Sequence, residues 1–255
     1  MDINRIVIWF SAGVTSAVAA KLTVNKYRGV LPIHLVNTDT GSEHEDNYRF
    51  MNDVSKWLDL PLEIIRSEKY RSTFEVYDAS GWFLMVGAGA KCTTELKKLP
   101  RRMYERVATD LQVFGFDASE RGRGRKFQEN NPEVNAWFPL IEEGITKNEA
   151  RQMLKQAGIV EPLTYGLGFK NANCLAAGCI KGGMGYWNHY RKVFPEAFDR
   201  MARKERELGF AINATEKRVG GKRIKTPVFL DELPENAGNH DAEEAIQCGL
   251  FCGTI

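Results

Sequence analysis

The cysteines are the residues of this 255-residue chain whose types and spacing first suggest chemistry. Cys174 and Cys179 are separated by four residues in a stretch rich in Gly and Asn, Cys92 lies far upstream, and Cys248 and Cys252 lie near the C-terminal end. Thiolates that a curling loop brings together suit a metal ion or an iron–sulfur cluster. The spacing departs from the usual Cys-x-x-Cys, so a coincidental pair of small buried side chains is the alternative.

A turn of small and hydroxyl-bearing residues is a second candidate site. Its size would let backbone N–H groups approach an oxyanion, and the helix that follows would add the positive end of its dipole. The motif is neither a Walker A sequence nor GxGxxG, which argues against a kinase-type or nicotinamide-binding site. A tight turn without a ligand is the alternative. The residues of this turn are Ser11, Ala12, Gly13, Val14, Thr15 and Ser16.

A polar turn follows the next apolar run along the chain. In an open parallel sheet, ligands bind beyond the carboxyl ends of the strands, so this turn and the first one would line the same crevice. The alternative is an Asx-type turn in which Asp39 only caps the helix that follows. The residues of the turn are Asn37, Thr38, Asp39, Thr40 and Gly41.

Buried strands that alternate with helices must position these turns. Such alternation predicts an α/β fold with a doubly wound, mainly parallel sheet. The predicted strands are Ile6–Phe10, Leu31–Val36, Leu62–Ile65 and Leu111–Phe116. The predicted helices include Ala17–Leu22, Glu45–Leu58, Thr146–Ala157 and the charged Pro195–Leu208. Thr146 and Glu149 form a capping-box pattern at the start of the third of these helices. The stretch Glu235–Asp241 is expected to be a mobile link to the cysteine-bearing tail.

Composition limits the class of protein. Lys and Arg number 35 against 33 Asp and Glu, and the net charge of +2 is too small for a protein held to nucleic acid by bulk charge. No apolar run approaches the ~20 residues of a membrane span. The apolar N-terminal stretch is too short for a signal-peptide core, so we expect a cytoplasmic protein. Thiols stay reduced there, which favours metal or redox chemistry over disulfides.

Taken in order along the chain, these motifs resemble the phosphoadenosine phosphosulfate (PAPS) reductase family of the PP-loop, or adenine nucleotide alpha-hydrolase-like, superfamily. The tail Gln247–Leu250 is similar to the family's C-terminal Glu-Cys-Gly-Leu-His element. The other motifs that carry the resemblance are Ser11–Ser16, Asp39–Gly41, Cys92-Thr93 with Leu96-Lys97 and Pro100, Gly115-Phe116 with Glu120, Arg121 and Arg125, Pro139–Glu142, and Gly166–Phe169 leading into Cys174 and Cys179.

The resemblance implies a nucleotide site. The Ser11–Ser16 turn would hold phosphate or sulfate oxygens, and the residues from Asn37 to Gly41 would contact the adenosine. Guanidinium and ammonium groups would clamp the anionic groups; a solvated basic loop is the alternative. The residues implied for this part of the site are Lys97, Glu120, Arg121 and Arg125, with Arg123 between the last two.

The resemblance also implies a [4Fe–4S] cluster held by Cys92, Cys174 and Cys179, with Cys252 as the fourth ligand or, alternatively, with three protein ligands and one iron left open to carry sulfur. Cys248 would be the catalytic nucleophile, and Cys248 and Cys252 could exchange these two roles. The chain departs from the family pattern in three places. Thr93 replaces the second cysteine of a Cys-Cys pair, four residues rather than two separate the later pair, and Thr15 replaces the Asp of ATP-using members, which disfavours ATP cleavage.

The sequence therefore predicts a sulfonucleotide reductase-like oxidoreductase of sulfur metabolism. Its substrate would be an adenine nucleotide (PAPS, APS or ATP), and a thioredoxin-like protein could donate electrons. Residues 1–170 would form the PP-loop nucleotide-binding domain, and residues 171–255 a cysteine-bearing segment with one charged helix and a mobile tail. The alternatives are an ATP-dependent sulfurtransferase that modifies a nucleic acid and a nucleotide-binding protein without turnover. A homo-oligomer is compatible with each of these three functions.

Overall fold

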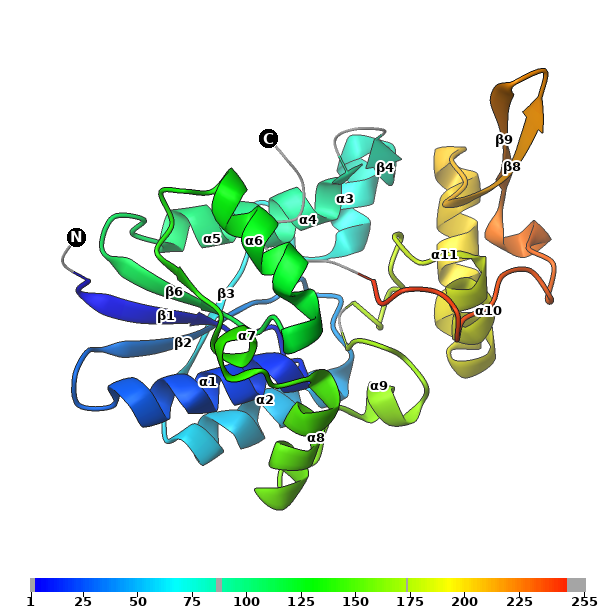
Figure 1. Cartoon of the computed structure of the whole chain (residues 1–255). Coiled ribbons are helices and arrows are strands. Elements are labelled where there is room, and N and C mark those ends of the chain that lie inside the picture. The colour runs from blue at the N-terminus through cyan, green and yellow to red at the C-terminus, as the bar shows by residue number, and fades with distance from the viewer. Residues whose placement is uncertain (1–2, 86–88, 173, 247–255) are drawn as a thin grey trace.

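A five-stranded parallel sheet forms the centre of the computed structural model, which describes residues 3–85, 89–172 and 174–246 (Figure 1). The strand order is β3-β2-β1-β6-β7, and every neighbouring pair is parallel. Strands β2 and β3 follow β1 on one side of it, and β6 and β7 lie on its other side. This reversal of strand order makes a topological switch point between β1 and β6. The predicted α/β class is confirmed. The bounds are β1 Arg5–Trp9, β2 Ile33–Thr38, β3 Leu62–Ile65, β6 Asp110–Phe114 and β7 Ala136–Trp137.

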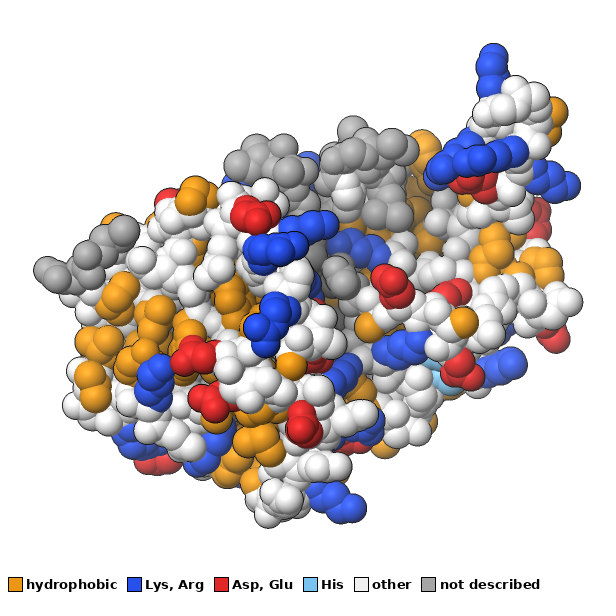
Figure 2. All heavy atoms as spheres, viewed as in Figure 1, with side chains coloured by type: hydrophobic (Ala, Val, Ile, Leu, Met, Phe, Trp, Pro, Cys, Tyr) orange, Lys and Arg blue, Asp and Glu red, His pale blue; other side chains and the backbone are white. Residues whose placement is uncertain are grey.

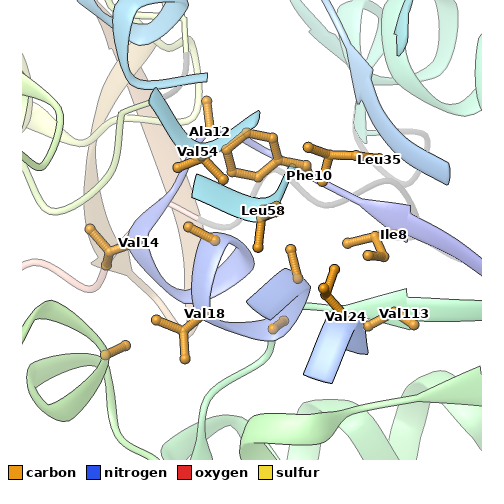
Figure 3. Packing of buried hydrophobic residues seen from close by; sticks show 14 of the residues in the cluster. Ile8, Phe10, Ala12, Val14, Val18, Val24, Leu35, Val54, Leu58 and Val113 are labelled. Atoms are coloured by element: carbon orange, nitrogen blue, oxygen red, sulfur yellow. The ribbon is translucent and has the colours of Figure 1, made fainter. Parts of the chain in front are cut away.

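Strand β1 is buried along its whole length because helices cover both faces of the sheet. Ile6 and Ile8 point to one face, where they join an apolar cluster with residues of α1, α2 and α8. Val7 and Trp9 point to the other face, where they pack with aromatic side chains that include residues of β6 and α6. Figure 3 shows part of the first cluster. The bounds of these helices are α1 Val14–Tyr27, α2 Glu45–Leu58, α6 Arg121–Asn130 and α8 Lys147–Gln156.

Several elements coincide with the sequence prediction. The bounds of α2, β3 and α11 (Pro195–Leu208) are those predicted. The capping box of α8 forms between Thr146 and Glu149. Within the described residues, no helix has both the length and the apolar character that crossing a membrane requires. The remaining elements are α3 Thr73–Ser80, β4 Leu84–Met85, β5 Gly89–Ala90, α4 Lys91–Thr93, the π-helix Thr94–Lys98, α5 Leu99–Tyr104, the 3₁₀ turns Ala118–Glu120 and Leu230–Glu232, α7 Pro139–Glu143, α9 Leu163–Gly166, α10 Met184–Val193, α11 Pro195–Leu208, β8 Asn213–Val219 and β9 Lys222–Val228.

The C-terminal part of the chain packs against helices of the N-terminal part. Trp187 and Tyr190 of α10 share an apolar cluster with Tyr77 of α3 and with Cys92. The stretch Glu235–Asp241, expected to be a mobile link, instead packs on α10. A Cβ atom at Gly185 would lie 2.4 Å from the backbone nitrogen of His240, so only glycine permits this approach. The amide of Asn188 also donates to the Pro234 and Ala237 carbonyls at 2.8 and 2.7 Å.

A buried carboxylate holds the base of the β8–β9 hairpin. Glu205 of α11 is fully buried, and its two oxygens accept hydrogen bonds from the backbone N–H groups of Ile212 and Leu230, each at 2.5 Å. These two residues flank the hairpin on either side. Burial raises the pKa of Glu205 from 4.5 to about 7, although both N–H donors act in the opposite direction.

This shift makes stability depend on pH. Between about pH 4.5 and pH 7 the folded protein binds a proton at Glu205 that the unfolded chain has released, so the free energy of unfolding falls as pH rises through this window. We expect a fall of about 1–3 kcal/mol. The Glu205→Gln variant should lack this component when urea unfolding is measured across the window. Parallel pH profiles for the two proteins would contradict the assignment.

Candidate functional site

The turns after β1, β2 and β6 border a cavity of about 890 Å³ at the carboxyl edge of the sheet. This is the edge where a switch point opens a crevice in doubly wound folds. From the turn predicted to bind an anion, Ser11, Gly13 and Thr15 line the cavity. The alternate residues Ala12, Val14 and Ser16 are buried beneath them. The turn therefore presents one row of its residues to the cavity and anchors itself in the core with the other.

Local geometry explains the shape of this turn. Ala12 has a left-handed backbone with φ of 57°, which lets the chain reverse from strand to helix. The Ser16 hydroxyl donates to the Gly13 carbonyl at 2.8 Å, and the Ser11 hydroxyl donates to that of Ser16 at 3.2 Å. Gly115, after β6, approaches so closely that a Cβ atom there would lie 2.5 Å from the Cα of Ser16. The strand ends and the N-terminus of α1 are thus held together by backbone contact.

A tyrosine and a lysine from distant parts of the chain complete this end of the cavity. The Tyr165 hydroxyl accepts a hydrogen bond from the Val14 backbone N–H at the start of α1, and burial raises the pKa of Tyr165 to about 12. The Lys147 ammonium lies 4.9 Å from the centre of the Tyr165 ring. Burial lowers the pKa of Lys147 from its ordinary value. Sequence reasoning missed both residues, because only the folded chain brings the start of α8 and the helix α9 to the first turn.

Helix α6 presents only part of the implied set of cations to the cavity. Arg121 and Arg125 do not line the cavity: Arg121 donates to the Ile141 carbonyl at 3.4 Å, and Arg125 lies 3.8 Å from Glu129 on the exposed side. Arg123, which the resemblance implied, and Lys126, which it did not, lie three positions apart on one face of the helix and line the cavity. The stretch is a helix rather than the alternative of a solvated loop, and helical spacing selects which of its cations reach the cavity.

Two predicted residues, Lys97 and Glu120, line the cavity as expected. Lys97 is buried in the π-helix Thr94–Lys98, shortly after Cys92. Glu120 closes a capping box by accepting from the Asp117 backbone N–H at 3.1 Å, and its other oxygen pairs with Arg123. The Glu120 carboxylate therefore positions the guanidinium group over the Phe116 ring, 4.1 Å from its centre.

The second predicted turn divides between the cavity and the protein interior. Asn37 lines the cavity, donates to the Phe10 carbonyl at 2.7 Å, and keeps a buried amide oxygen that has no hydrogen-bond partner among the described residues. Asp39 does not line the cavity. Its carboxylate accepts from Arg66 at 2.7 and 2.9 Å and from the Gly41 backbone at 2.8 Å, which matches the alternative of an Asx-type turn. Thr40 and Gly41 also lie outside the cavity lining.

Tyr77 packs in an apolar cluster with Cys92, and Cys179 packs against the same cluster. The Tyr77 hydroxyl donates to the Cys92 sulfur at 3.8 Å. Burial, together with the thiols of Cys92, Cys179 and Cys174, raises the pKa of Tyr77 well above its usual value. Cys174 has a left-handed backbone with φ of 57°, and its sulfur lies 3.4 Å from the Thr40 hydroxyl. The meeting of these three thiols at one point stays a prediction.

These thiols do not by themselves make a metal site. In the part of the chain that the structure describes, no group of three or more His, Cys, Asp or Glu side chains is arranged to hold a metal ion. Cys248 and Cys252 lie outside the described residues, so the fourth predicted ligand and the predicted nucleophile have no described position. The described donor set does not fit a [4Fe–4S] cluster as it stands, and the cluster stays a prediction.

Hydrogen bonds connect the thiols to the cavity. Glu43 lines the cavity and accepts from the Cys174 backbone N–H at 3.2 Å and from the Thr40 hydroxyl at 3.1 Å. Ile246 also lines the cavity and is the last residue that the structure describes. Its carbonyl accepts a hydrogen bond from the Asn171 amide at 2.6 Å. The cavity therefore lies between the N-terminus of α1 and the cysteine-bearing loops.

Comparisons with known proteins found one partial sequence match and solved structures of low sequence identity. No family model matches the chain. A stretch of 60 residues, 24% of this chain, is 42% identical to the uncharacterized nin region protein ORF290 of Escherichia phage lambda and spans 21% of that protein's length. Among solved structures, the chain is similar to the phosphoadenylyl-sulfate (PAPS) reductase of Candida auris, solved as a phosphate complex, with a TM-score of 0.48, 15% identity, and coverage of 66% of this chain and 80% of that one. It is also similar to the U34-tRNA thiolase NcsA of Methanococcus maripaludis, solved with its [4Fe–4S] cluster, with a TM-score of 0.45, 15% identity, and coverage of 82% and 74%.

The contact between Gly115 and Ser16 can be tested by adding one methyl group. Gly115→Ala forces a Cβ atom to within 2.5 Å of Ser16, and we expect it to lower the free energy of unfolding by about 1–3 kcal/mol. Gly122→Ala is the matched control, because nothing lies within 4 Å of its Cβ position and alanine favours a helix, by up to about 1 kcal/mol. Urea unfolding measures both. Equal stability of the two variants would contradict a close contact at Gly115.

Proposed function

We propose that the protein binds an adenine nucleotide in the cavity at the sheet edge and uses cysteine thiols to reduce a sulfur atom that this nucleotide carries, as a sulfonucleotide reductase does. The observation that carries the proposal is the position of the cavity. The turn that precedes the N-terminus of α1 borders the cavity, which is where a helix would attract an anion, and Glu43 in the lining is hydrogen-bonded to the loop that bears Cys174.

The cavity lining supports an adenine nucleotide as ligand. Asn37, at the end of β2, contributes a polar side chain to the lining. The rings of Trp9, Phe114 and Phe116 provide apolar surface for a base. At the other end, the hydroxyls of Ser11 and Thr15 and the helix dipole can hold phosphate or sulfate oxygens.

The proposed reaction uses two thiols. The thiolate of Cys248 attacks the sulfur of the bound sulfonucleotide, forming an S–S bond and breaking the S–O bond, so that the adenine nucleotide leaves with its phosphate. A second thiol, from Cys252 or a thioredoxin-like donor, attacks the cysteine sulfur, forms a disulfide and releases sulfite. Chain connectivity supports the choice of Cys248, because two residues span at most ~7 Å and Ile246 lines the cavity. Lys97 and Lys147 would stabilise charge on the leaving group.

The nucleotide site predicts a specific lysine effect. Lys147→Met removes an ammonium group from the cavity, and we expect the affinity for adenosine 3′,5′-bisphosphate to fall at least about tenfold, since hydrogen bonds to charged groups contribute about 1.5–3 kcal/mol. Lys155→Met, on the same helix but exposed and outside the lining, is the matched control. Isothermal titration calorimetry measures both. Equal affinities would place the anion elsewhere.

The reaction itself predicts sulfite. Incubation of the protein with PAPS or adenylyl sulfate and reduced thioredoxin should release sulfite, and Cys248→Ser should abolish the release while leaving nucleotide binding intact. Quantitation of sulfite with a thiol-reactive fluorophore gives the readout. Nucleotide binding without sulfite release from either substrate would refute the reductase. In that case, ATP-dependent pyrophosphate release stimulated by nucleic acid would identify the sulfurtransferase alternative.

A further inference from the structure

The hairpin formed by β8 and β9 projects from the protein as a basic arm, here defined as residues 213–228 (Figure 1). Every residue from Ala214 to Pro227 is exposed, so neither face of this two-stranded ribbon packs on the rest of the chain. A ribbon of seven residues per strand is about 23 Å long. A surface of this length without an intramolecular partner is available to another molecule.

Charge on the arm is concentrated and of one sign. Five basic side chains and one acidic side chain, Glu216, give the arm a surplus of four positive charges, whereas the whole chain has a net charge of only +2. Figure 2 shows Lys and Arg side chains standing out on this arm. The rest of the molecule is therefore slightly acidic, and the arm carries its positive potential. The basic residues are Lys217, Arg218, Lys222, Arg223 and Lys225.

Four of the five positive charges of the arm have no acidic partner among the described residues. Arg223 pairs with Glu216 at 3.3 Å, and within the described residues none of the other four forms an ion pair. Cations of the neighbouring helix α11 differ, because Arg206 binds Asp231 and Lys204 binds Asp78, each at 2.7 Å. The protein thus neutralises the cations at the base of the arm and leaves those along it exposed.

Strand register adds evidence of a ligand. Arg218 lies directly opposite Arg223, and opposed like charges destabilise a hairpin. The opposite face of the ribbon carries Lys217 and Lys222 beside the exposed Val219 and Ile224. An anionic partner would remove the repulsion and could contact both faces at once, as it would if the ribbon entered a groove.

We propose that the β8–β9 arm binds double-stranded DNA, with its lysines and arginines contacting the phosphates on both sides of the major groove. That groove, ~12 Å wide in B-DNA, admits a two-stranded ribbon. The deep, narrow major groove of duplex RNA does not. Glu205 holds both ends of the arm to α11, so the arm would enter the groove from a fixed base.

The test measures binding of the full chain to a fluorescein-labelled 24-base-pair DNA duplex by anisotropy at 50–200 mM salt. We expect the affinity to fall steeply with salt. A variant with Arg218→Gln and Lys222→Gln should bind at least about tenfold more weakly and lower the salt slope by about 2, since each phosphate contact contributes about 0.9. A second, independent double variant, Lys217→Gln with Lys225→Gln, should lower the affinity and the salt slope by similar amounts.

The control pair is Lys56→Gln with Lys155→Gln, which removes two exposed positive charges from α2 and α8 and should change the affinity less than about twofold. Equal weakening by control and arm variants, or no binding by the unaltered protein at 50 mM salt, would overturn the proposal. So would duplex RNA binding as tightly as DNA. Adenosine 3′,5′-bisphosphate affinity should be unchanged in the arm variants, which separates this proposal from the proposed function.

Discussion

Backbone contact between the ends of β1 and β6 and the start of α1 organises the site. Gly115 lies against Ser16 so closely that no side chain fits between them. The contact holds the positive end of the α1 dipole at the switch point, where the chains after β1 and β6 leave the sheet in opposite directions. The cavity lies where the two connections separate. Its polar lining follows from strand ends and turns, and its position follows from sheet order.

Hydrogen bonds between distant segments position the loop that bears Cys174. The amide of Asn47 in α2 donates to the Ala172 carbonyl at 2.9 Å, and the Ala176 backbone N–H donates to the Ser42 carbonyl at 3.1 Å. These bonds place the Cys174 loop beside the turn after β2. Helix α3 brings Tyr77 from the other side, in an aromatic cluster shared with α10. This buried aromatic cluster has a low effective dielectric constant, which disfavours a charged phenolate. The hydroxyl of Tyr77 therefore stays protonated and remains a donor to the Cys92 sulfur.

Sequence reasoning predicted the elements better than the side-chain directions. Apolar runs and caps are local signals, and β3, α2 and α11 lie at their predicted residues. The role of Asp39 depended on Arg66, which binds it from 27 positions away, and no local pattern indicates that pair. The resemblance implied Arg121, Arg123 and Arg125 together, whereas helical spacing selects Arg123 and adds Lys126. A period of three or four residues in the basic stretch was the signal that could have found Lys126.

Residues that complete the cavity from far along the chain were beyond prediction for a different reason. Lys147 and Tyr165 belong to α8 and α9, and their approach to the first turn depends on how α8 packs on α1. Residue type says little about such helix packing, since many surface lysines and tyrosines have the same local sequence context. Cysteine is rare and chemically distinctive, so the sequence alone singled out Cys92, Cys174 and Cys179 as candidates, whereas lysine is common.

The exposed ribbon has two open edges, since each of its strands pairs on one side only. Unpaired N–H and C=O groups along such edges are templates on which a second polypeptide can add a strand and begin to aggregate. Like charges along β8 and β9 repel an approaching identical ribbon, and Pro227 removes one backbone donor near the base. The same lysines and arginines therefore also oppose edge-to-edge pairing of two such ribbons, and neutralising them would remove that barrier.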